Sequence, residues 1–353
     1  MSAWSVNGAA THCLQLTREL ARRGHALTLV CRPDSWIGAQ HLGDGTTVER
    51  SDQHRWPPDE IRRMARLLRD RDVDVIHTHA SRAHFFGVLL RAATGIPVVA
   101  TAHAHRLQGH WAFNNHVIAL STAGARFQRW NLVPASRVSL VHQFVDTAVF
   151  SPPDEARRRD ARAALALRDS ALAVGYVGSI FREKGLQDLV AAWPAVAAAI
   201  EEAQLVIAGD GPPAFLNELR AAIAAQPLPH RVDWLGRRGN IPLVMCALDV
   251  LVVPSHDESA SIVGIEAMAA GLPVVATRVG GIPEYVADGV AGVLIDRGDR
   301  SALSEALIRL LCESRRRAEY GRQGRARALE QFSLPVQVAK IEAILARAST
   351  RRS

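Results

Sequence analysis

Lysine, cysteine and long apolar runs are scarce in this chain of 353 residues. Only Lys184 and Lys340 are lysines, so arginine supplies nearly all of the 42 positive side chains. The four cysteines have no CxxC spacing, which disfavours a disulfide framework or a zinc knuckle and favours a reducing cytoplasm. No apolar run reaches the roughly 18 residues of a membrane-spanning helix, and we expect no secretion signal at the start. Hydrophobic residues make up 48% of the chain, which excludes a disordered or collagen-like protein.

The positive charge is concentrated in the N-terminal half. Residues 1–150 hold 17 arginines against 11 acidic residues, together with 12 of the 14 histidines. Such a half favours an anionic partner, whether phosphate groups, lipid headgroups or nucleic acid. A solvated basic surface explains the same charge equally well. The helix expected over residues 60–71 surrounds an apolar stripe with Arg62, Arg63, Arg66, Arg69 and Arg71.

Strand and helix patterns alternate along both halves of the chain, with Pro152 and Pro153 between them. In the first half, helices are expected over residues 14–24, 60–71 and 84–94, and strands over 26–31, 73–76 and 97–101. In the second half, strands are expected over 171–177, 204–208, 232–235, 250–253, 273–277 and 292–295, and helices over 154–168, 186–200, 213–225, 262–270 and 301–312. A final helix is expected over 335–348. This rhythm predicts two doubly wound α/β domains facing across a cleft, at residues 1–153 and 154–332, followed by a helix and tail over 333–353.

The most informative segment, residues 254–273, reads as a strand end, a polar turn, a short helix and a glycine stop. Ser259 and Ser261 are candidate N-caps of this helix. The backbone N–H groups of its first turn, at Ile262 and Val263, have no helical partner and lie at the positive end of the helix dipole. They therefore suit a diphosphate.

Two carboxylates accompany this helix, Glu258 before it and Glu266 within it. Flanking an anion site, they can hold two different sugars by their hydroxyl groups. The alternative is that Glu258 is a surface turn residue and Glu266 a solvated helical glutamate.

Lys184 lies in a second loop, residues 175–185, which follows a strand and opens a helix. A point cation in such a turn is a candidate phosphate clamp, although a solvated lysine is equally consistent. The glycine turns at residues 209–211 and 280–281 allow backbone to approach a ligand closely, or are simply tight turns. No G-x-G-x-x-G opens a helix, which disfavours nicotinamide or flavin binding.

Histidine pairs follow two strands of the N-terminal half: His77 with His79, and His103 with His105. No Asp, Glu or Cys lies close to either pair in sequence, so a zinc site is disfavoured. A polar histidine at a strand end is favoured instead, with His103 as a hydrogen-bond or proton partner.

Taken together, these segments resemble the family-4 retaining glycosyltransferases of the GT-B fold, over nearly the whole chain and most strongly over residues 173–295. Glu258 and Glu266 match the E-x7-E motif of that family, in the context PSHDESASIVGIEAMAAGLPVVATRVGG. The resemblance implies that Glu266 binds the ribose of a nucleotide and Glu258 the transferred sugar. It also implies that the final helix crosses back to the N-terminal domain.

The remaining implied donor contacts come from both halves. Lys184 matches a lysine that contacts the donor diphosphate, His103 a histidine of a T-x-H motif that holds the donor sugar near the acceptor, and Gly8 a glycine of a GGAE-like loop under the donor phosphates. The resemblance implies no metal and no cofactor, since the helix N-terminus and the cations stabilise the leaving group.

Three departures from the family pattern stand out. An arginine usual in the family is replaced by Ser179, with Arg182 near enough in sequence to substitute for it as a donor contact. The GGAE-like loop reads Asn7-Gly8-Ala-Ala. Only six residues precede that loop, so the first strand of the N-terminal sheet is expected to be missing or short.

The leading hypothesis is a metal-independent retaining glycosyltransferase that moves a hexosyl or related sugar from a UDP- or GDP-linked donor. The acceptor is expected to be a glycan or a lipid-linked molecule, as in glycan or lipopolysaccharide biosynthesis, bound by the N-terminal half. Nucleic acid is not an expected partner. An anionic membrane surface is a candidate partner of residues 60–71, which would place a cytoplasmic enzyme at the inner face of the membrane. The alternatives are a non-catalytic nucleotide-sugar-binding relic and a glycoside hydrolase using Glu258 and Glu266.

Overall fold

The computed structural model describes residues 8–51, 58–228 and 231–350 of the chain. These residues form two compact units. The first comprises residues up to Phe144 together with those from Leu334 onward, and the second comprises Val145–Ser333. We expected the boundary at residue 153, but residues 145–153 belong to the second unit. Val145 N donates to Phe332 O (2.9 Å), and Phe150 is buried in the second unit's core.

The first unit contains two parallel sheets, one of two strands and one of four. The strands are β1 (Leu27–Cys31), β2 (Thr46–Arg50), β3 (Ile76–His79), β4 (Val98–Ala102), β5 (His116–Ala119) and β6 (Val138–Leu140). The helices are α1 (Gly8–Arg22), α2 (Pro58–Asp70), α3 (Ser81–Thr94), α4 (Thr122–Phe127) and α13 (Leu334–Ser349), with 3₁₀ turns at η1 (Trp36–Ala39), η2 (Gly109–Phe113), η3 (Gln128–Asn131) and η4 (Ala135–Arg137). β1 pairs with β2, and β3 to β6 pair in chain order. The expected missing first strand concerns residues 1–7, which lie outside the described part of the chain.

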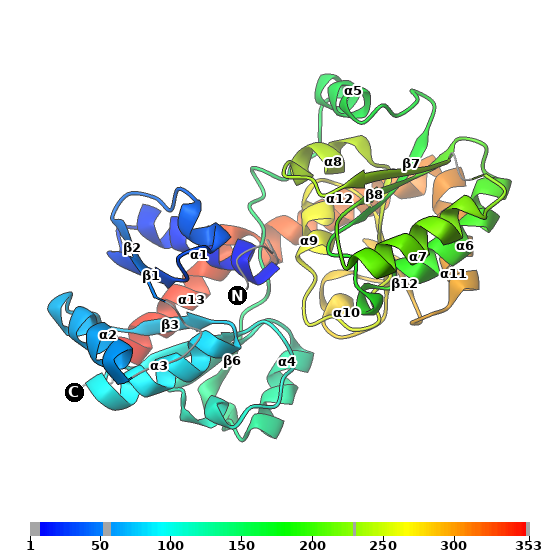
Figure 1. Cartoon of the computed structure of the whole chain (residues 1–353). Coiled ribbons are helices and arrows are strands. Elements are labelled where there is room, and N and C mark those ends of the chain that lie inside the picture. Colours follow the sequence, from blue (N-terminus) through cyan, green and yellow to red (C-terminus); the bar gives the residue numbers. More distant parts are fainter. Residues whose placement is uncertain (1–7, 52–57, 229–230, 351–353) are drawn as a thin grey trace. The chain divides into compact units, whose positions relative to one another are not determined.

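Helix α13, at the far end of the chain, belongs to the first unit, as predicted. It packs against α1 and β4 (Figure 1, red beside blue and cyan). Its apolar face places Val338 and Ile341 in one cluster with Leu16, Val99 and Ile118, all of which are buried. Arg23 and His25 also reach its Glu342, at 2.8 and 2.6 Å.

The second unit is a six-stranded parallel sheet in the order β12-β11-β10-β7-β8-β9. Its strands are β7 (Leu172–Val177), β8 (Ala203–Ala208), β9 (Val232–Gly236), β10 (Val250–Val253), β11 (Val274–Thr277) and β12 (Gly292–Ile295). Its helices are α5 (Glu155–Ala164), α6 (Leu186–Ala199), α7 (Pro213–Ala224), α8 (Ile241–Ala247), α9 (Ile262–Ala269), α10 (Ile282–Tyr285), α11 (Arg300–Cys312) and α12 (Ser314–Gln331), with a 3₁₀ turn η5 (Arg182–Lys184). The central strands are continuous apolar runs because both faces of the sheet are covered.

Two cores lie on the two faces of this sheet. One is built with α6, α7 and α11, and the other with α5, α8, α9 and α12. Successive residues of β7 alternate between them, with Ala173 in the second core and Val174 in the first. The unit is therefore doubly wound, and the predicted α/β class with two Rossmann-like units is confirmed.

The structure differs from the expected elements in several places. Strand β3 begins at Ile76, three residues later than predicted, so His77 and His79 lie inside it. Helix α1 begins at Gly8 rather than at residue 14, and α12, β2, β5 and β6 were not predicted. No helix among the described residues is long and apolar enough to span a membrane.

Candidate functional site

Three loops meet at the carboxyl ends of β7, β10 and β11 in the second unit. The backbone N–H of His256 donates to Glu183 O at 2.7 Å, which joins the first loop to the second. Gly281 N donates to Glu258 O at 3.2 Å, which joins the third loop to the second. A Cβ at Gly185 would lie 1.8 Å from Pro254 O, and one at Gly280 would lie 1.6 Å from Glu258 O. Glycine is therefore required at both positions, which also have positive φ angles of 71° and 53°.

Lys184 and Glu258 form an ion pair at this meeting point. The Lys184 Nζ lies 2.8 Å from Glu258 Oε2. The lysine side chain is 30% exposed and the glutamate side chain 13% exposed. The two residues are 74 positions apart in sequence, and the loop contacts hold their backbones together. A half-buried pair of this kind can exchange partners when an anion and a hydroxyl donor arrive.

Helix α9 begins directly after this pair. Ser261 is its N-cap and accepts a hydrogen bond from Gly264 N at 3.4 Å, so of the two candidate serines the second caps the helix. Ile262 and Val263 form the first turn and are partly exposed. A Cβ at Gly264 would lie 2.5 Å from Tyr285 Oη, which shows that this glycine makes room for the tyrosine ring.

Glu266 lies one turn into α9 and is buried, with 7% of its surface exposed. Burial raises the pKa of its carboxyl group to about 7, because the charged form is desolvated. Within the described residues, no hydrogen bond or neighbouring charge offsets this desolvation of the carboxyl group. A buried carboxylate without a donor is costly, so the site is arranged for a ligand that brings hydroxyl donors.

Of the two expected donor contacts in the β7 loop, Ser179 and Arg182, the side chain of Arg182 is engaged elsewhere. Arg182 pairs with Glu218 on α7 and lies over the ring of Phe215, with its guanidinium carbon 4.7 Å from the ring centroid. The carbonyl oxygen of Ser179 accepts a hydrogen bond from Tyr176 Oη at 2.8 Å. Arg182 therefore pairs with Glu218 and does not join Lys184 beside Glu258.

The glycine turn at residues 209–211 packs against protein rather than open space. A Cβ at Gly209 would lie 2.0 Å from Gly178 O, and one at Gly211 would lie 1.9 Å from Ile180 O. These glycines therefore let the loops after β7 and β8 pass close to one another.

A network of ion pairs in the same unit supports this site and was not predicted from the sequence. Asp188 on α6 binds His256 Nε2 at 2.5 Å and Arg300 Nε at 2.8 Å. The network fixes the loop that carries Glu258. Its sequence signal was weak, since Asp188, His256 and Arg300 lie in three separate segments.

A cluster of histidines forms in the first unit, where β3 and β4 end. His79 Nδ1 lies 3.1 Å from His103 Nε2, and His77 Nε2 lies 2.8 Å from Thr101 Oγ1. His12, on α1, was not singled out from the sequence. It is fully buried, and its Nδ1 lies 2.9 Å from Gln143 Oε1. Because an amide oxygen only accepts, His12 Nδ1 carries the proton and Nε2 has a free lone pair.

Burial holds these rings neutral. It lowers the pKa of His12 to about 4, in spite of the hydrogen bond to Gln143, and the pKa of His77 to about 3. Burial, together with the neighbouring histidines, holds the pKa of His79 and of His103 well below the usual value. At neutral pH, His103 is therefore a hydrogen-bonding group and not an imidazolium acid.

Three members of the cluster could hold a metal ion. One ring nitrogen of each of His12, His79 and His103 lies within 4.8 Å of the other two. Neutral imidazoles are ligands for transition metals. No carboxylate or thiolate joins this group within the described residues, so the donor set lacks an anionic ligand.

His105 and Gly8 lie outside the cluster. His105 packs beside Phe127, with ring centroids 5.2 Å apart, so the pair predicted with His103 does not act together. Gly8 opens α1, and nothing lies within 4 Å of a Cβ built there.

The five arginines predicted to surround the apolar stripe of α2 are mostly paired. Arg62 binds Asp59, Arg63 binds Glu60, and Arg71 binds Glu49. The stripe itself packs inward through Met64, Ala65 and Leu68. The positive charge that α2 offers to a membrane is therefore smaller than its sequence suggests.

Two family models match most of this chain. Residues 6–149 match a family model described as Glycosyltransferase Family 4, and residues 171–313 match one described as Glycosyl transferases group 1. HepE of Anabaena, solved with UDP-glucose, superposes with a TM-score of 0.86 at 21% identity and covers 97% of each chain. The fold is thus that of the GT-B glycosyltransferases.

Two curated relatives carry the assignment further. The chain is 33% identical to alpha-maltose-1-phosphate synthase of Mycolicibacterium smegmatis, over 73% of this chain and 75% of that protein. It is 25% identical to N-acetyl-alpha-D-glucosaminyl L-malate synthase of Bacillus anthracis, over 96% and 94%. The chain therefore belongs to the glycosyltransferase family that the two models describe.

Proposed function

We propose that this protein transfers a sugar from a UDP- or GDP-linked donor to an acceptor, with retention of configuration and without a metal ion. Family membership supports sugar transfer as the reaction class. The observation that best supports a nucleotide-sugar as the donor is the buried, unpartnered carboxylate of Glu266 near the N-terminus of α9. A ribose would supply the hydroxyl donors that this carboxylate lacks.

In this proposal, Lys184 and Glu258, which bind each other, each exchange that contact for a contact with the donor. On donor binding, the diphosphate takes over Lys184, together with the free N–H groups of Ile262 and Val263. Glu258, released from the lysine, accepts hydroxyl groups of the transferred sugar. The cation and the helix dipole then stabilise the charge that develops on the leaving diphosphate. A glycoside hydrolase would have no use for this cation beside its carboxylates.

We assign the histidine cluster a role in binding the sugar and the acceptor. A neutral His103 would donate or accept a hydrogen bond at a sugar hydroxyl, held in place by His79. The proposed acceptor is a glycan or a lipid-linked molecule. The names of two relatives include L-malate and D-inositol 3-phosphate, so small anionic acceptors belong in the same screen.

A two-stage experiment tests the proposal. Thermal unfolding is first followed with UDP-glucose, UDP-N-acetylglucosamine and GDP-mannose, since a ligand at about 100 times its dissociation constant adds roughly 2.7 kcal/mol. The donor that stabilises the protein is then incubated with candidate acceptors, and nucleoside diphosphate release is measured. Stabilisation followed by acceptor-dependent release supports the proposal. Stabilisation without release in any mixture would favour the non-catalytic relic.

A further inference from the structure

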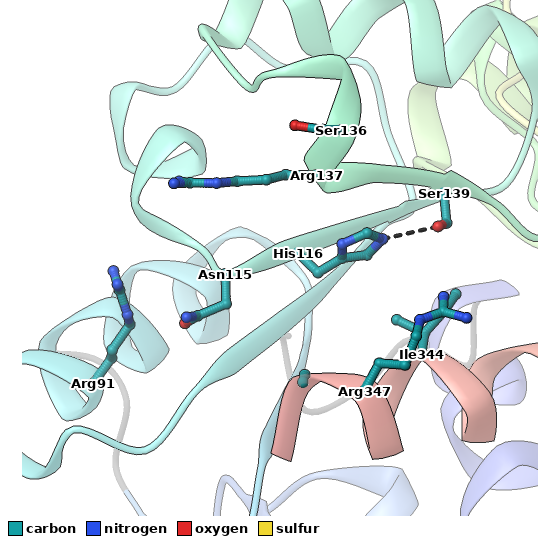
Figure 2. A pocket seen from close by; sticks show the side chains of 9 residues that line it. Arg91, Asn115, His116, Ser136, Arg137, Ser139, Ile344 and Arg347 are labelled. Atoms are coloured by element: carbon teal, nitrogen blue, oxygen red, sulfur yellow. Dashed lines mark hydrogen bonds between the residues drawn. The ribbon is translucent and has the colours of Figure 1, made fainter. Parts of the chain in front are cut away.

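A cavity of about 270 Å³ in the first unit lies away from both groups of site residues. Its polar lining comes from four elements: Arg91 of α3, Asn115 and His116 at the start of β5, Arg137 of η4, and Arg347 of α13. Ser136 and Ser139 add hydroxyl groups (Figure 2), and Ile344 and Ala348 are the apolar residues of the lining. Asn115 and Arg137 directly precede β5 and β6, so the cavity lies at the amino ends of these parallel strands. His79 and His103 lie at the opposite, carboxyl ends of the strands of the same sheet.

Three arginines line this cavity, and no acidic residue does. Among the described residues, none of Arg91, Arg137 and Arg347 forms an ion pair with a carboxylate. Elsewhere in the same unit, arginines do find acids, as Arg22 does with Glu19. Like charges gathered around one cavity repel one another, and an anion bound between them removes that repulsion.

Among the polar groups beside these cations, the Asn115 amide is oriented as a hydrogen-bond donor. Asn115 Oδ1 accepts from Val98 N at 2.9 Å, which leaves the amide NH2 of Asn115 as a donor. Arg91 Nη1 donates to Phe113 O at 2.7 Å, which fixes one guanidinium in place. His116 Nε2 lies 2.8 Å from Ser139 Oγ, the contact drawn in Figure 2. Donors of this number and charge match the oxygens of a phosphoryl group.

We propose that this cavity binds a phosphoryl group carrying two or more negative charges, at a site separate from the donor and acceptor sites. A soluble phosphorylated compound and the headgroup of an anionic lipid both supply this chemistry. Because the cavity lies at the amino ends of the strands, its ligand does not compete with the nucleotide-sugar. It would act as a regulator or as an anchor of the chain to a phosphorylated surface.

Calorimetric titration with inorganic pyrophosphate tests the proposal. Because pyrophosphate also suits the proposed donor site, all proteins carry Lys184→Ala, so failure at the cavity is distinguishable from failure of the proposed function. In that background we expect binding of one equivalent, weakened about tenfold or more by Arg137→Gln and by Arg347→Gln. Arg129→Gln, which removes the same charge from an exposed position of the same unit that does not line the cavity, leaves the affinity unchanged.

A second experiment, with lipid vesicles, distinguishes a lipid headgroup from a soluble compound as the source of the phosphoryl group. Flotation with phosphatidic acid vesicles, reversed by pyrophosphate and lost in Arg137→Gln, assigns the cavity to a lipid headgroup. Pyrophosphate binding without such flotation assigns it to a soluble compound. The proposal is overturned if neither probe binds at millimolar concentration, or if Arg129→Gln weakens binding as much as Arg137→Gln does.

Discussion

Replacing Glu266 by glutamine should stabilise the ligand-free protein at high pH while weakening its nucleotide binding. The carboxyl group is buried, and its pKa is raised from 4.5 to about 7 by desolvation. Between these two pH values the folded protein holds a proton that the unfolded chain has lost. Stability therefore falls as pH rises from about 4.5 to 7 and stays low above that range.

The magnitude follows from the size of that shift. One pKa unit corresponds to about 1.4 kcal/mol, so the charged Glu266 costs on the order of 3 kcal/mol above pH 7. Glu266→Gln removes the charge and keeps the shape of the side chain. The free energy of unfolding of the variant should thus lack the decline of the parent between pH 4.5 and 7, and should exceed that of the parent at pH 8. A nucleoside diphosphate should stabilise the parent more than the variant.

Urea unfolding at several pH values, with and without UDP, measures both effects. Glu201→Gln is the matched control, because Glu201 is exposed and its removal should leave the pH dependence as in the parent. The reasoning is refuted if Glu266→Gln and the parent have parallel stability curves from pH 4.5 to 8. Equal stabilisation of both proteins by UDP would refute the ribose contact alone.

Further consequences concern other parts of the molecule. Lys184→Ala should weaken nucleoside diphosphate binding by about 1.5–3 kcal/mol in calorimetry, and an unchanged affinity would exclude the phosphate contact. Gly264→Ala should destabilise the second unit by about 1–3 kcal/mol in urea unfolding, because the added Cβ would lie 2.5 Å from Tyr285 Oη. In flotation with anionic vesicles at low salt, the Arg66→Gln variant should bind less than the Arg62→Gln variant, because Arg62 is already paired with Asp59. Equal binding of the two variants would exclude α2 as the membrane contact. Exhaustive chelation should leave sugar transfer unchanged, and loss of transfer that zinc restores would contradict the proposal that the reaction needs no metal ion.

Sequence reasoning located the second unit well because its signals are local. Each central strand is an apolar run that ends in a polar or glycine turn, and Ser261 stands where an N-cap is needed. The sequence did not reveal α12. Its composition is mostly polar and it contains Gly321 and Gly324, which argue against a helix. A Cβ at Gly321 would lie 2.1 Å from Gly271 O, so tertiary packing explains the glycine that propensity penalises.

Side-chain partners were the least predictable part of the site. The sequence indicated Lys184, Glu258 and Glu266 individually, but nothing local pairs a lysine with a glutamate 74 residues away. Arg182 looked available for a donor, yet Glu218 on the neighbouring helix takes it. His12 lies on a helix whose pattern shows only that its position faces inward, and the meeting of that face with β3 and β4 is a tertiary fact.

The most direct test of the central claim is a time-resolved proton NMR assay of sugar transfer from the donor that stabilises the protein. The account predicts release of nucleoside diphosphate and a product whose anomeric configuration equals that of the donor. The rate should fall strongly in Glu258→Gln, while nucleoside diphosphate binding by that variant is largely kept. An inverted product would contradict the proposed retention. Undiminished turnover in Glu258→Gln would contradict the assignment of the transferred sugar to the loop before α9.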